Sequence, residues 1–420
     1  MASPRLHARA DTVLGTDLGG WTVSTTTRTA TTKTARGVRV AVAAGLALGG
    51  LLVAAAPAQA LTTDRWWGAD RFATAAAVSG KAFAGGAKGA VVVNGGSSAD
   101  ALAAAPLAAS LHVPLLTVTG TQLPDVTRAE LARLAPERVW VVGGSAVVSD
   151  DVVKQVGQLA REGVTRLQGA DRYETAAMIA KDHFAGSATE VYVASGEGFA
   201  DALSAGAAGA AVGAPLLLTA PGSLPGSTAA ALGALQPTRI TVVGGTSVVS
   251  DDVLAQLEEG RPGVVVRRVW GDDRYETAAK VVLERTETAS RVLLASGANF
   301  PDALAGAALG QPLLLSRPDC LPQVTADAFA SLGTESVTGL GGAGVLSDAA
   351  LTGKVCAAAA PAPAPQPSPS SPPAVSTGSG VYYANCDAVR AAGKAPIRRG
   401  DPGYRSGLDS DGDGVGCERR

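Results

Sequence analysis

Apolar residues along the chain fall into two kinds of segment, which alternate from about residue 61 to residue 356. Short, continuously apolar runs are typical of strands that a parallel sheet buries on both faces. The longer segments between them place apolar residues three and four positions apart, as helices do. For the middle of this region the pattern predicts strands at 190–194, 215–219 and 239–243, and helices at 174–183, 200–212, 224–235 and 250–257.

This pattern occurs three times, with a period of about 100 residues. Gly-Ala-Asp-Arg-Phe-Ala-Thr at 68–74 returns as Gly-Ala-Asp-Arg-Tyr-Glu-Thr at 169–175 and as Gly-Asp-Asp-Arg-Tyr-Glu-Thr at 271–277. Each copy continues with an Asp-Ala-Leu segment and then with Val-Val-Gly-Gly, which the third copy reduces to Gly341-Gly342. A period of this length indicates tandem domains, because the units of short-repeat solenoids are smaller.

Strands that alternate with helices indicate a parallel sheet with helices on both faces. Right-handed crossovers then give a small, doubly wound α/β domain. We therefore predict three such domains in tandem, at 61–165, 166–267 and 268–356. The almost wholly apolar run 202–220 fits this scheme as a buried helix followed by a buried strand, because Pro215 interrupts it.

The first 60 residues have the pattern of a secretory signal region. Arg36 and Arg39 precede an uncharged stretch at 40–56, and Ala-Gln-Ala follows at 58–60. A basic segment, a short apolar segment and an A-x-A site are typical of a signal peptide, cleaved here after residue 60. The alternative is a retained membrane anchor, but the stretch is shorter than the roughly 20 residues that span a bilayer. We expect a secreted protein with no membrane span after cleavage.

The charge of the chain gives little attraction to polyanions. The formal net charge is -2, and the first 60 residues hold six Lys and Arg against two acidic residues. The remaining chain therefore has 29 basic and 35 acidic residues, a net charge of -6. We expect no nucleic-acid partner, because such partners select a strongly basic surface.

Beyond the repeats the composition changes twice. Seven prolines stand among Ala, Ser, Gly and Thr at 357–380, which is typical of a stiff, solvated linker. The last segment, 381–420, is too small to build a sufficient core by itself. In an exported protein a disulfide is the expected reinforcement.

The four cysteines of the chain allow three pairings. We predict Cys386–Cys417 and Cys320–Cys356, because the linker separates these pairs into different domains. Metal ligation by thiolates is the alternative, but no C-x-x-C spacing favours it.

Asp409, Asp411 and Asp413 place three carboxylates at alternate positions, and Gly414 follows them. Such a loop surrounds a hard cation with oxygen ligands, as at positions 1, 3, 5 and 6 of an EF-hand loop. The twelfth position is an arginine here, so Glu418 is the candidate for the closing ligand. We predict a calcium site on these four acids, with a plain Asp/Gly turn as the alternative.

Residues 381–418 resemble the excalibur calcium-binding domain of extracellular bacterial proteins. The resemblance rests on the Asp-x-Asp-x-Asp-Gly-x-x-Cys-Glu ending and on six further residues. These residues are Tyr383, Asn385, Arg390, Gly393, Pro402 and Tyr404. The resemblance implies that the module binds calcium.

Residues 61–352 resemble the cell wall binding repeat 2 family, whose three tandem copies anchor surface proteins and autolysins to anionic wall polymers. The resemblance rests on the Gly-x-Asp-Arg-Tyr/Phe-x-Thr-Ala entry, the Asp-Ala-Leu segment and the Val-Val-Gly-Gly strand exit, in register in three copies. It implies Rossmann-like domains in a triangular arrangement. It also implies attachment to a Gram-positive cell wall through a cell-wall polysaccharide or an anionic secondary wall polymer.

One candidate site for the polymer is the Gly-Gly turn after the last strand of a copy, because a strand end that leads to a helix N-terminus exposes N–H groups to an anion. The residues concerned are Gly143, Gly144, Gly244 and Gly245. The alternative is a plain turn with a serine N-cap at Ser149, Ser250 or Ser347. Acidic residues directly after these serines favour the alternative, because they already occupy the positive helix end.

The second candidate is the arginine of the repeated Asp-Arg pair, at Arg71, Arg172 and Arg274. A guanidinium group binds phosphate or carboxylate in a planar, bidentate manner. The alternative is a salt bridge between domains. The aspartates of the Asp-Ala-Leu segments, Asp100, Asp201 and Asp302, each open an Ala-rich helix, and we expect them to be N-caps.

The sequence offers no positive sign of an enzyme. His7 lies in the leader, and His112 and His183 do not match between copies. No G-x-S-x-G, H-E-x-x-H or G-x-x-x-x-G-K-[ST] motif occurs. We expect a secreted, non-catalytic protein that binds wall polymer and carries a calcium-binding tail. The alternatives are a cell-wall hydrolase or autolysin regulator with its site in the repeats, and an adhesin or scaffold under calcium control.

Overall fold

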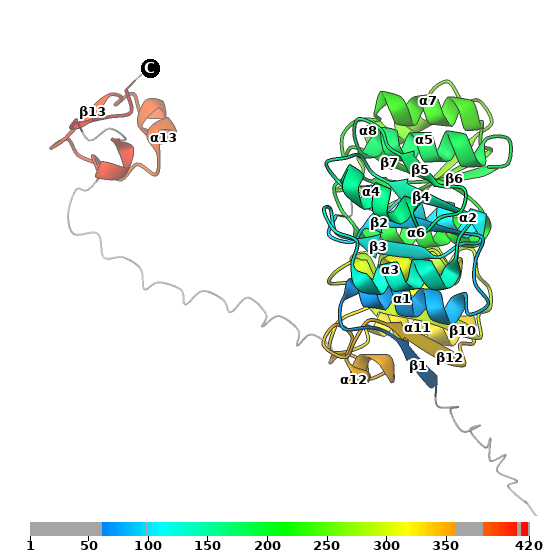
Figure 1. Cartoon of the computed structure of the whole chain (residues 1–420). Coiled ribbons are helices and arrows are strands. Elements are labelled where there is room, and N and C mark those ends of the chain that lie inside the picture. Colours follow the sequence, from blue (N-terminus) through cyan, green and yellow to red (C-terminus); the bar gives the residue numbers. More distant parts are fainter. Residues whose placement is uncertain (1–60, 98–99, 358–380, 410–412, 419–420) are drawn as a thin grey trace, which may run out of the picture. The chain divides into compact units, whose positions relative to one another are not determined.

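The computed structural model describes residues 61–97, 100–357, 381–409 and 413–418. Residues 61–357 form three α/β repeats, and residues 381–418 form a small C-terminal module (Figure 1). The predicted signal region and nearly all of the predicted linker lie outside the described residues.

Each repeat is built on a four-stranded, wholly parallel sheet. The strand orders are β3-β2-β4-β5 in sheet 1, β7-β6-β8-β9 in sheet 2 and β11-β10-β12-β1 in sheet 3. The strands of these sheets are β1 (Thr62–Trp66), β2 (Gly89–Asn94), β3 (Leu115–Val118), β4 (Arg138–Val142), β5 (Val164–Leu167), β6 (Glu190–Ser195), β7 (Leu216–Thr219), β8 (Arg239–Val243), β9 (Val265–Val269), β10 (Arg291–Ser296), β11 (Leu313–Ser316) and β12 (Ser336–Leu340).

Four helices accompany each sheet. They are α1 (Arg71–Ala82), α2 (Ala104–Leu111), α3 (Asp125–Leu134), α4 (Asp150–Gly157), α5 (Arg172–Phe184), α6 (Ala200–Val212), α7 (Gly226–Leu235), α8 (Asp251–Glu258), α9 (Arg274–Leu283), α10 (Pro301–Ala307), α11 (Gln323–Leu332) and α12 (Asp348–Leu351). In the second repeat the predicted strands and helices are confirmed, with ends that differ by two residues or fewer. The apolar run 202–220 is indeed a buried helix, α6, followed by a buried strand, β7.

The first described strand belongs to the last sheet. β1 pairs in parallel with β12, from Thr62 opposite Ser336 to Trp66 opposite Leu340, and Figure 1 shows the blue strand β1 beside β12. β5 and β9 are the corresponding edge strands of sheets 1 and 2. Each edge strand leads directly into the first helix of the next repeat, so β1 joins the third repeat to the first and closes the three repeats into a circle.

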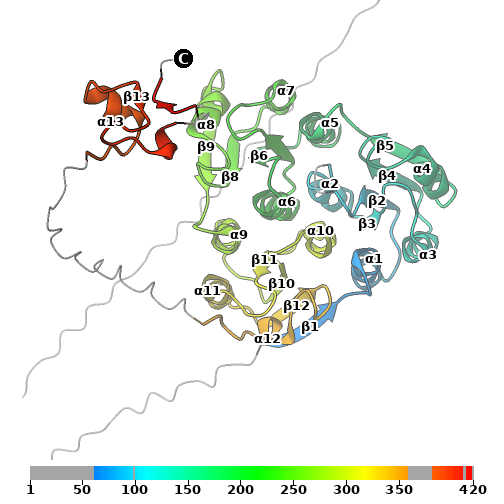
Figure 2. The ribbon, with the colours of Figure 1, turned by 90° about the vertical axis from the view of Figure 1, so that its left-hand side faces the viewer.

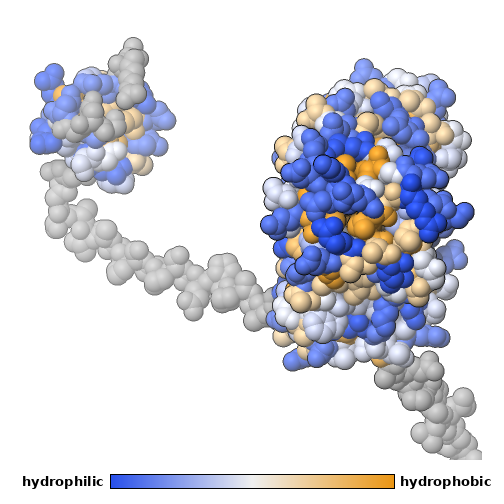
Figure 3. Space-filling view, viewed as in Figure 1, coloured by the Kyte–Doolittle hydropathy of each residue, from blue (hydrophilic) through white to orange (hydrophobic). Residues whose placement is uncertain are grey.

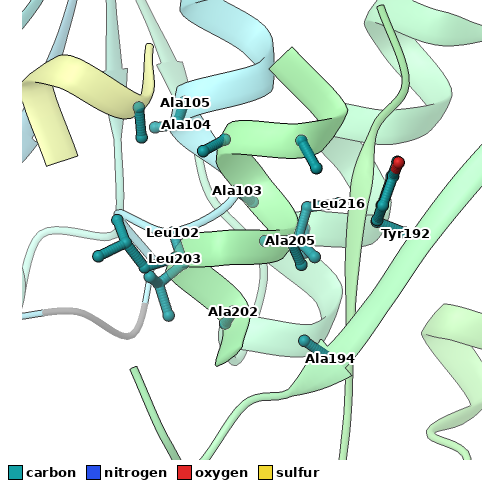
Figure 4. Packing of buried hydrophobic residues seen from close by; sticks show 14 of the residues in the cluster. Leu102, Ala103, Ala104, Ala105, Tyr192, Ala194, Ala202, Leu203, Ala205 and Leu216 are labelled. Atoms are coloured by element: carbon teal, nitrogen blue, oxygen red, sulfur yellow. The ribbon is translucent and has the colours of Figure 1, made fainter. Parts of the chain in front are cut away.

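The helices α2, α6 and α10 lie on the inner side of the three sheets (Figure 2). They are rich in Ala and Gly because their backbones approach each other closely. A methyl group placed on Gly206 of α6 would lie 3.2 Å from the carbonyl oxygen of Leu102, and one placed on Gly310 would lie 3.1 Å from that of Ala210. Leu102 and Leu203 belong to one core cluster that all three repeats share (Figure 4).

The strands show which face of a sheet meets this shared core. In β2, Val91 and Val93 belong to the shared core, whereas Ala90 and Val92 belong to a second cluster under α3 and α4. This alternation follows from the two-residue period of a strand.

Figure 3 shows a mostly polar surface on one side of the repeats, with apolar residues gathered toward its middle. In the part of the chain that the structure describes, no helix is long and apolar enough to cross a membrane.

The C-terminal module contains helix α13 (Cys386–Ala391), a 3₁₀ turn, η1 (Ser406–Leu408), and the antiparallel strands β13 (Ile397–Arg398) and β14 (Val415–Gly416). Its core is small, formed chiefly by Val389, Ile397 and Leu408. Two disulfides are present, Cys386–Cys417 in this module and Cys320–Cys356 at the end of the third repeat.

Candidate functional site

The aspartates of the repeated Asp-Arg pair are helix N-caps. Asp70, Asp171 and Asp273 have extended backbones before α1, α5 and α9. Each carboxylate accepts a hydrogen bond from the backbone N–H three residues later, at 2.8, 2.8 and 2.9 Å respectively. The first turn of each helix therefore already has an anionic partner from the chain itself.

The arginines of the pair bind the strand end of their own repeat. Nη1 of Arg71, Arg172 and Arg274 donates to a glycine carbonyl directly after a strand. The acceptors are Gly95, Gly196 and Gly297, at 2.7, 2.5 and 2.6 Å. Among the described residues none of these arginines forms an ion pair, so the salt bridge considered above is not formed there. Arg274 also lies across a repeat boundary, 5.4 Å from the ring centre of Phe199.

The prediction that Asp100, Asp201 and Asp302 are N-caps is wrong. The residues at the N-caps of α2, α6 and α10 are Ala103, Phe199 and Phe300, and none makes a side-chain cap bond. The Asp-Ala-Leu segments are offset from the start of these helices, because Asp201 and Asp302 already lie in the first helical turn and Asp100 lies in the turn before α2.

These carboxylates lie instead against the Gly-Gly turns. The first glycine of each turn has a positive φ, +111° at Gly143, +122° at Gly244 and +98° at Gly341, which only glycine adopts at low cost. A methyl group there would come within 3.2, 3.0 and 2.6 Å of an Oδ2 atom of the neighbouring aspartate. A side chain at this position would therefore displace the carboxylate.

Each of these aspartates also faces the Asp-Arg motif of the next repeat. Burial raises the pKa of Asp100, while the Thr175 hydroxyl and the charge of Arg172 lower it. Burial likewise raises the pKa of Asp201, while the charge of Arg274 lowers it. Asp302 of the third repeat faces the first repeat in the same way. Burial raises the pKa of Asp302, while the Thr74 hydroxyl and the charge of Arg71 lower it. We call these three places junctions 1–2, 2–3 and 3–1.

A second set of arginines, which the sequence reasoning missed, supports the junctions. Arg65, Arg166 and Arg268 stand on the edge strands and donate through Nη1 to the carbonyl of the first glycine of the Gly-Gly turn, at 2.7, 2.8 and 2.8 Å. Each also forms an ion pair through Nη2 with the aspartate that begins the helix after that Gly-Gly turn. These acids are Asp348, Asp150 and Asp251, at 2.9, 2.8 and 3.0 Å. The signal for them was available, because each arginine lies three residues before the glycine of the Gly-x-Asp-Arg motif.

The helices after the Gly-Gly turns have serine N-caps, which the sequence analysis gave as the alternative to an anion site. Ser149, Ser250 and Ser347 each accept a hydrogen bond from the N–H three residues later. Gly143, Gly144, Gly244 and Gly245 thus line the junctions beside helix ends that the chain caps itself.

Two junctions open to the surface as clefts. The cleft at junction 2–3 has a volume of about 480 Å³ and brings together Asp201, Gly245, Trp270 and Arg274. The cleft at junction 3–1 has a volume of about 420 Å³ and brings together the corresponding residues Asp302, Gly342, Trp67 and Arg71. Both lie past the carboxyl ends of the strands, where α/β sheets bind their ligands.

A larger cavity, of about 720 Å³, lies between the end of α6 and the third repeat. It opens at the amino ends of β10 and β11, where Arg291 and Leu313 line it. We place the candidate site at the junctions, because they are repeated and combine charged and aromatic side chains.

The two histidines of the described residues lie far from this chemistry. His112 is the C-cap of α2 in the left-handed conformation. The ring of His183 packs edge-on against Trp140 at 6.5 Å, and burial lowers the pKa of His183.

In the C-terminal module, the described part of the acidic loop is ordered by hydrogen bonds. The buried Asp409 accepts from the Tyr404 hydroxyl at 2.5 Å and from the N–H of Gly414 at 2.9 Å. Gly414 has φ +91°, as the sharp turn of such a loop requires. Asp413 and Glu418 are exposed, and Asp411 lies outside the described residues. Among the residues with described positions, no three acidic, His or Cys side chains cluster in a way that would hold a metal ion.

The three α/β repeats with matching junctions correspond to a known family. The chain belongs to the Cell wall binding domain 2 (CWB2) family, which matches residues 65–153, 166–254 and 268–351. Residues 383–418 match the Excalibur calcium-binding domain.

Individual relatives share the repeats. The chain is 32% identical over 264 residues to N-acetylmuramoyl-L-alanine amidase LytC of Bacillus subtilis (strain 168), covering 62% of this chain and 51% of LytC. It is 30% identical over 264 residues to the Amidase enhancer of the same organism, covering 62% of this chain and 35% of that protein. The chain thus spans about half and about a third of the length of these relatives.

Solved structures share the fold. Cwp6 from Clostridium difficile is similar with a TM-score of 0.63 and 27% identity, over 70% of this chain and 48% of Cwp6. Cwp8 from the same organism is similar with a TM-score of 0.63 and 28% identity, over 69% of this chain and 50% of Cwp8.

Proposed function

We propose that this protein is a secreted, non-catalytic surface protein whose three repeats bind a cell-wall polymer at the junctions between them. Membership of the CWB2 family and the similarity to LytC, the Amidase enhancer and Cwp6 support an association with the cell wall. We favour the junctions as the binding site, because each joins an aspartate, a Gly-Gly turn and an arginine from separate parts of the chain.

The observation that carries this proposal is a carboxylate that is buried or half-buried at the same point of all three junctions. Asp100 is only 8% exposed, and burial raises the pKa of Asp100, Asp201 and Asp302. Burying a carboxylate costs stability unless a partner compensates it. An arrangement that is costly, repeated and, at junctions 2–3 and 3–1, open to a cleft is typical of a binding site.

The C-terminal module supports calcium binding as a second function. Asp409, Asp411, Asp413 and Glu418 would hold the ion, since carboxylate oxygens are the ligands that calcium prefers. The Cys386–Cys417 disulfide and the β13–β14 pair hold the C-terminal end of the segment that carries these acids. The hydrogen bonds of Asp409 with Tyr404 and Gly414 hold its start. The ion would neutralise the loop's acidic side chains and order the loop.

The test is sedimentation of the mature chain, residues 61–420, with purified walls of the bacterium that encodes it. We expect sedimentation with intact walls and its loss after acid removes the secondary polymers. We also expect no release of soluble wall fragments. Sedimentation that survives the acid would point to another wall component, and fragment release would favour the hydrolase alternative that the amidase relatives suggest.

A further inference from the structure

Two exposed tryptophans stand at the rims of the junction clefts. Trp67 is 54% exposed and Trp270 is 48% exposed, although large aromatic side chains are usually well buried. Trp67 lines the cleft at junction 3–1, and Trp270 lines the cleft at junction 2–3. Both indoles keep an exposed apolar surface in clefts that the half-buried Asp302 and Asp201 also line.

The two tryptophans occupy equivalent positions at junctions 3–1 and 2–3. Junction 1–2 has a different residue at that position. A methyl group on Gly342 would lie 3.3 Å from Cε3 of Trp67, and one on Gly245 would lie 3.7 Å from Cε3 of Trp270. At junction 1–2 the corresponding neighbour of Gly144 is Oε1 of Gln168, at 3.4 Å. The three junctions therefore share their carboxylate and arginine, but only two of them have a tryptophan beside the second glycine of the turn.

The charges in these clefts do not favour an anionic ligand. Asp201, Asp272 and Asp273 line the cleft at junction 2–3 against one arginine, Arg274. At junction 3–1, two aspartates stand against one arginine. The helix N-termini that would attract phosphate are already capped, by Asp273 and Asp70 on one side and by serines on the other.

The same groups suit a sugar. Hydroxyl groups donate hydrogen bonds to carboxylates and accept them from a guanidinium group. The apolar face of a pyranose ring packs on an aromatic ring, which offers a large, rigid surface with a polar edge. Lys280, whose Nζ lies 5.7 Å from the ring centre of Trp270, adds one more donor beside that cleft.

We propose that Trp67 and Trp270 are stacking platforms for pyranose rings of the wall polysaccharide, with Asp302 and Asp201 accepting hydrogen bonds from the ring hydroxyls. The clefts at junctions 3–1 and 2–3 then recognise the sugar units of the polymer and not its anionic groups. Junction 1–2, which has Gln168, binds sugar more weakly. This inference rests on the proposed function, because it assumes that the junctions hold wall polymer.

The experiment exchanges the natural side chains between junctions. Trp67→Gln and Trp270→Gln introduce the residue that the fold already carries at position 168, so we expect both variants to remain folded. Each should weaken the binding of the mature chain to the isolated wall polysaccharide about three- to tenfold, since loss of an aromatic contact costs roughly 0.5–1.5 kcal/mol. Gln168→Trp should strengthen binding by a similar factor.

Binding is measured by titration calorimetry with acid-extracted wall polysaccharide, at low salt, in 0.5 M NaCl, and with inorganic phosphate as competitor. We expect little change with salt or phosphate, because screening weakens contacts between exposed charges and leaves stacking intact. Unaltered melting temperatures confirm that the variants are folded.

The outcomes separate the two ideas. If the wild-type chain binds neither walls nor polysaccharide, the proposed function is wrong, and this inference with it. If the wild-type chain binds but both Trp→Gln variants bind equally well, the stacking platforms are refuted while wall binding stands. Loss of wild-type binding in high salt or with phosphate would show that the anionic groups are recognised, and would likewise overturn the inference.

Discussion

Replacing Trp66 by alanine tests whether β1 completes the sheet of the third repeat. Trp66 and Trp67 are neighbours with opposite environments, 7% and 54% exposed. Trp66 ends β1 opposite Leu340 of β12 and belongs to the core that all three repeats share. Its Nε1 donates a hydrogen bond to Oδ2 of Asp64 at 2.8 Å.

The expected magnitude follows from this burial. Truncating a buried tryptophan to alanine removes its apolar contacts and leaves a cavity, which together cost about 3–5 kcal/mol. For a body of this size such a loss lowers Tm by on the order of 10 °C. Trp67→Ala is the matched control, because an exposed side chain contributes little, and we expect a loss below about 1 kcal/mol.

The free energy of unfolding is measured by urea denaturation of the mature chain, followed by far-UV circular dichroism. If Trp66→Ala and Trp67→Ala unfold at the same urea concentration, β1 does not contribute to the third repeat as the structure places it. If only Trp66→Ala is destabilised, the circular closure of the repeats is supported.

Three further perturbations have defined outcomes. Gly271→Ala should destabilise the protein by about 1–3 kcal/mol in urea unfolding, because the new methyl would lie 2.5 Å from a side-chain carbon and 2.7 Å from a backbone nitrogen of α9. The control Gly233→Ala, with open space around it, should be neutral or slightly stabilising. Equal losses of stability in the two variants would contradict the close approach at Gly271. Because burial raises the pKa of Asp201, this group's contribution to stability is full below the unfolded pKa near 3.8 and is lost as the pH rises through the raised folded pKa. Asp201→Asn should therefore have a higher Tm than the wild type at pH 7 and lose that advantage toward pH 4, and an unchanged difference across this range would refute the reasoning. Replacing Cys386 and Cys417 by serine removes a bridge across 31 residues and should cost the C-terminal module about 3–4 kcal/mol; NMR should show this module unfolded and the repeats intact, and a folded module would show that its small core suffices.

The strands that the sequence predicted in the second repeat are those buried on both faces. The strands β6, β7 and β8 are continuous apolar runs, so their pattern is visible without a partner. The edge strands β9 and β1 were missed for the opposite reason. β9 reads Val-Val-Arg-Arg-Val with no buried residue, and β1 begins with three exposed residues. The pairing of β1 with β12 joins residues more than 270 positions apart, which no local pattern reveals.

The candidate site could be predicted only in pieces. The motifs that contain Asp201, Gly244 and Arg274 were each visible, but their meeting depends on how one repeat docks on the next. The expectation that Asp201 is a helix cap came from its place at the start of an Ala-rich segment, and the helix begins one residue earlier. Trp67 and Trp270 directly precede the repeated Gly-x-Asp-Arg motif, yet their exposure follows from their position at the junction and not from their type.

Binding of a double junction variant to cell walls decides whether the junctions hold the wall polymer. Asp201→Asn with Asp302→Asn keeps the shape of both clefts and removes two half-buried carboxylates whose pKa values burial raises, so the variant should be folded and at least as stable as the wild type at pH 7. Charged hydrogen bonds contribute about 1.5–3 kcal/mol each, so sedimentation with walls should weaken at least tenfold. A folded double variant that sediments as well as the wild type would contradict binding at the junctions.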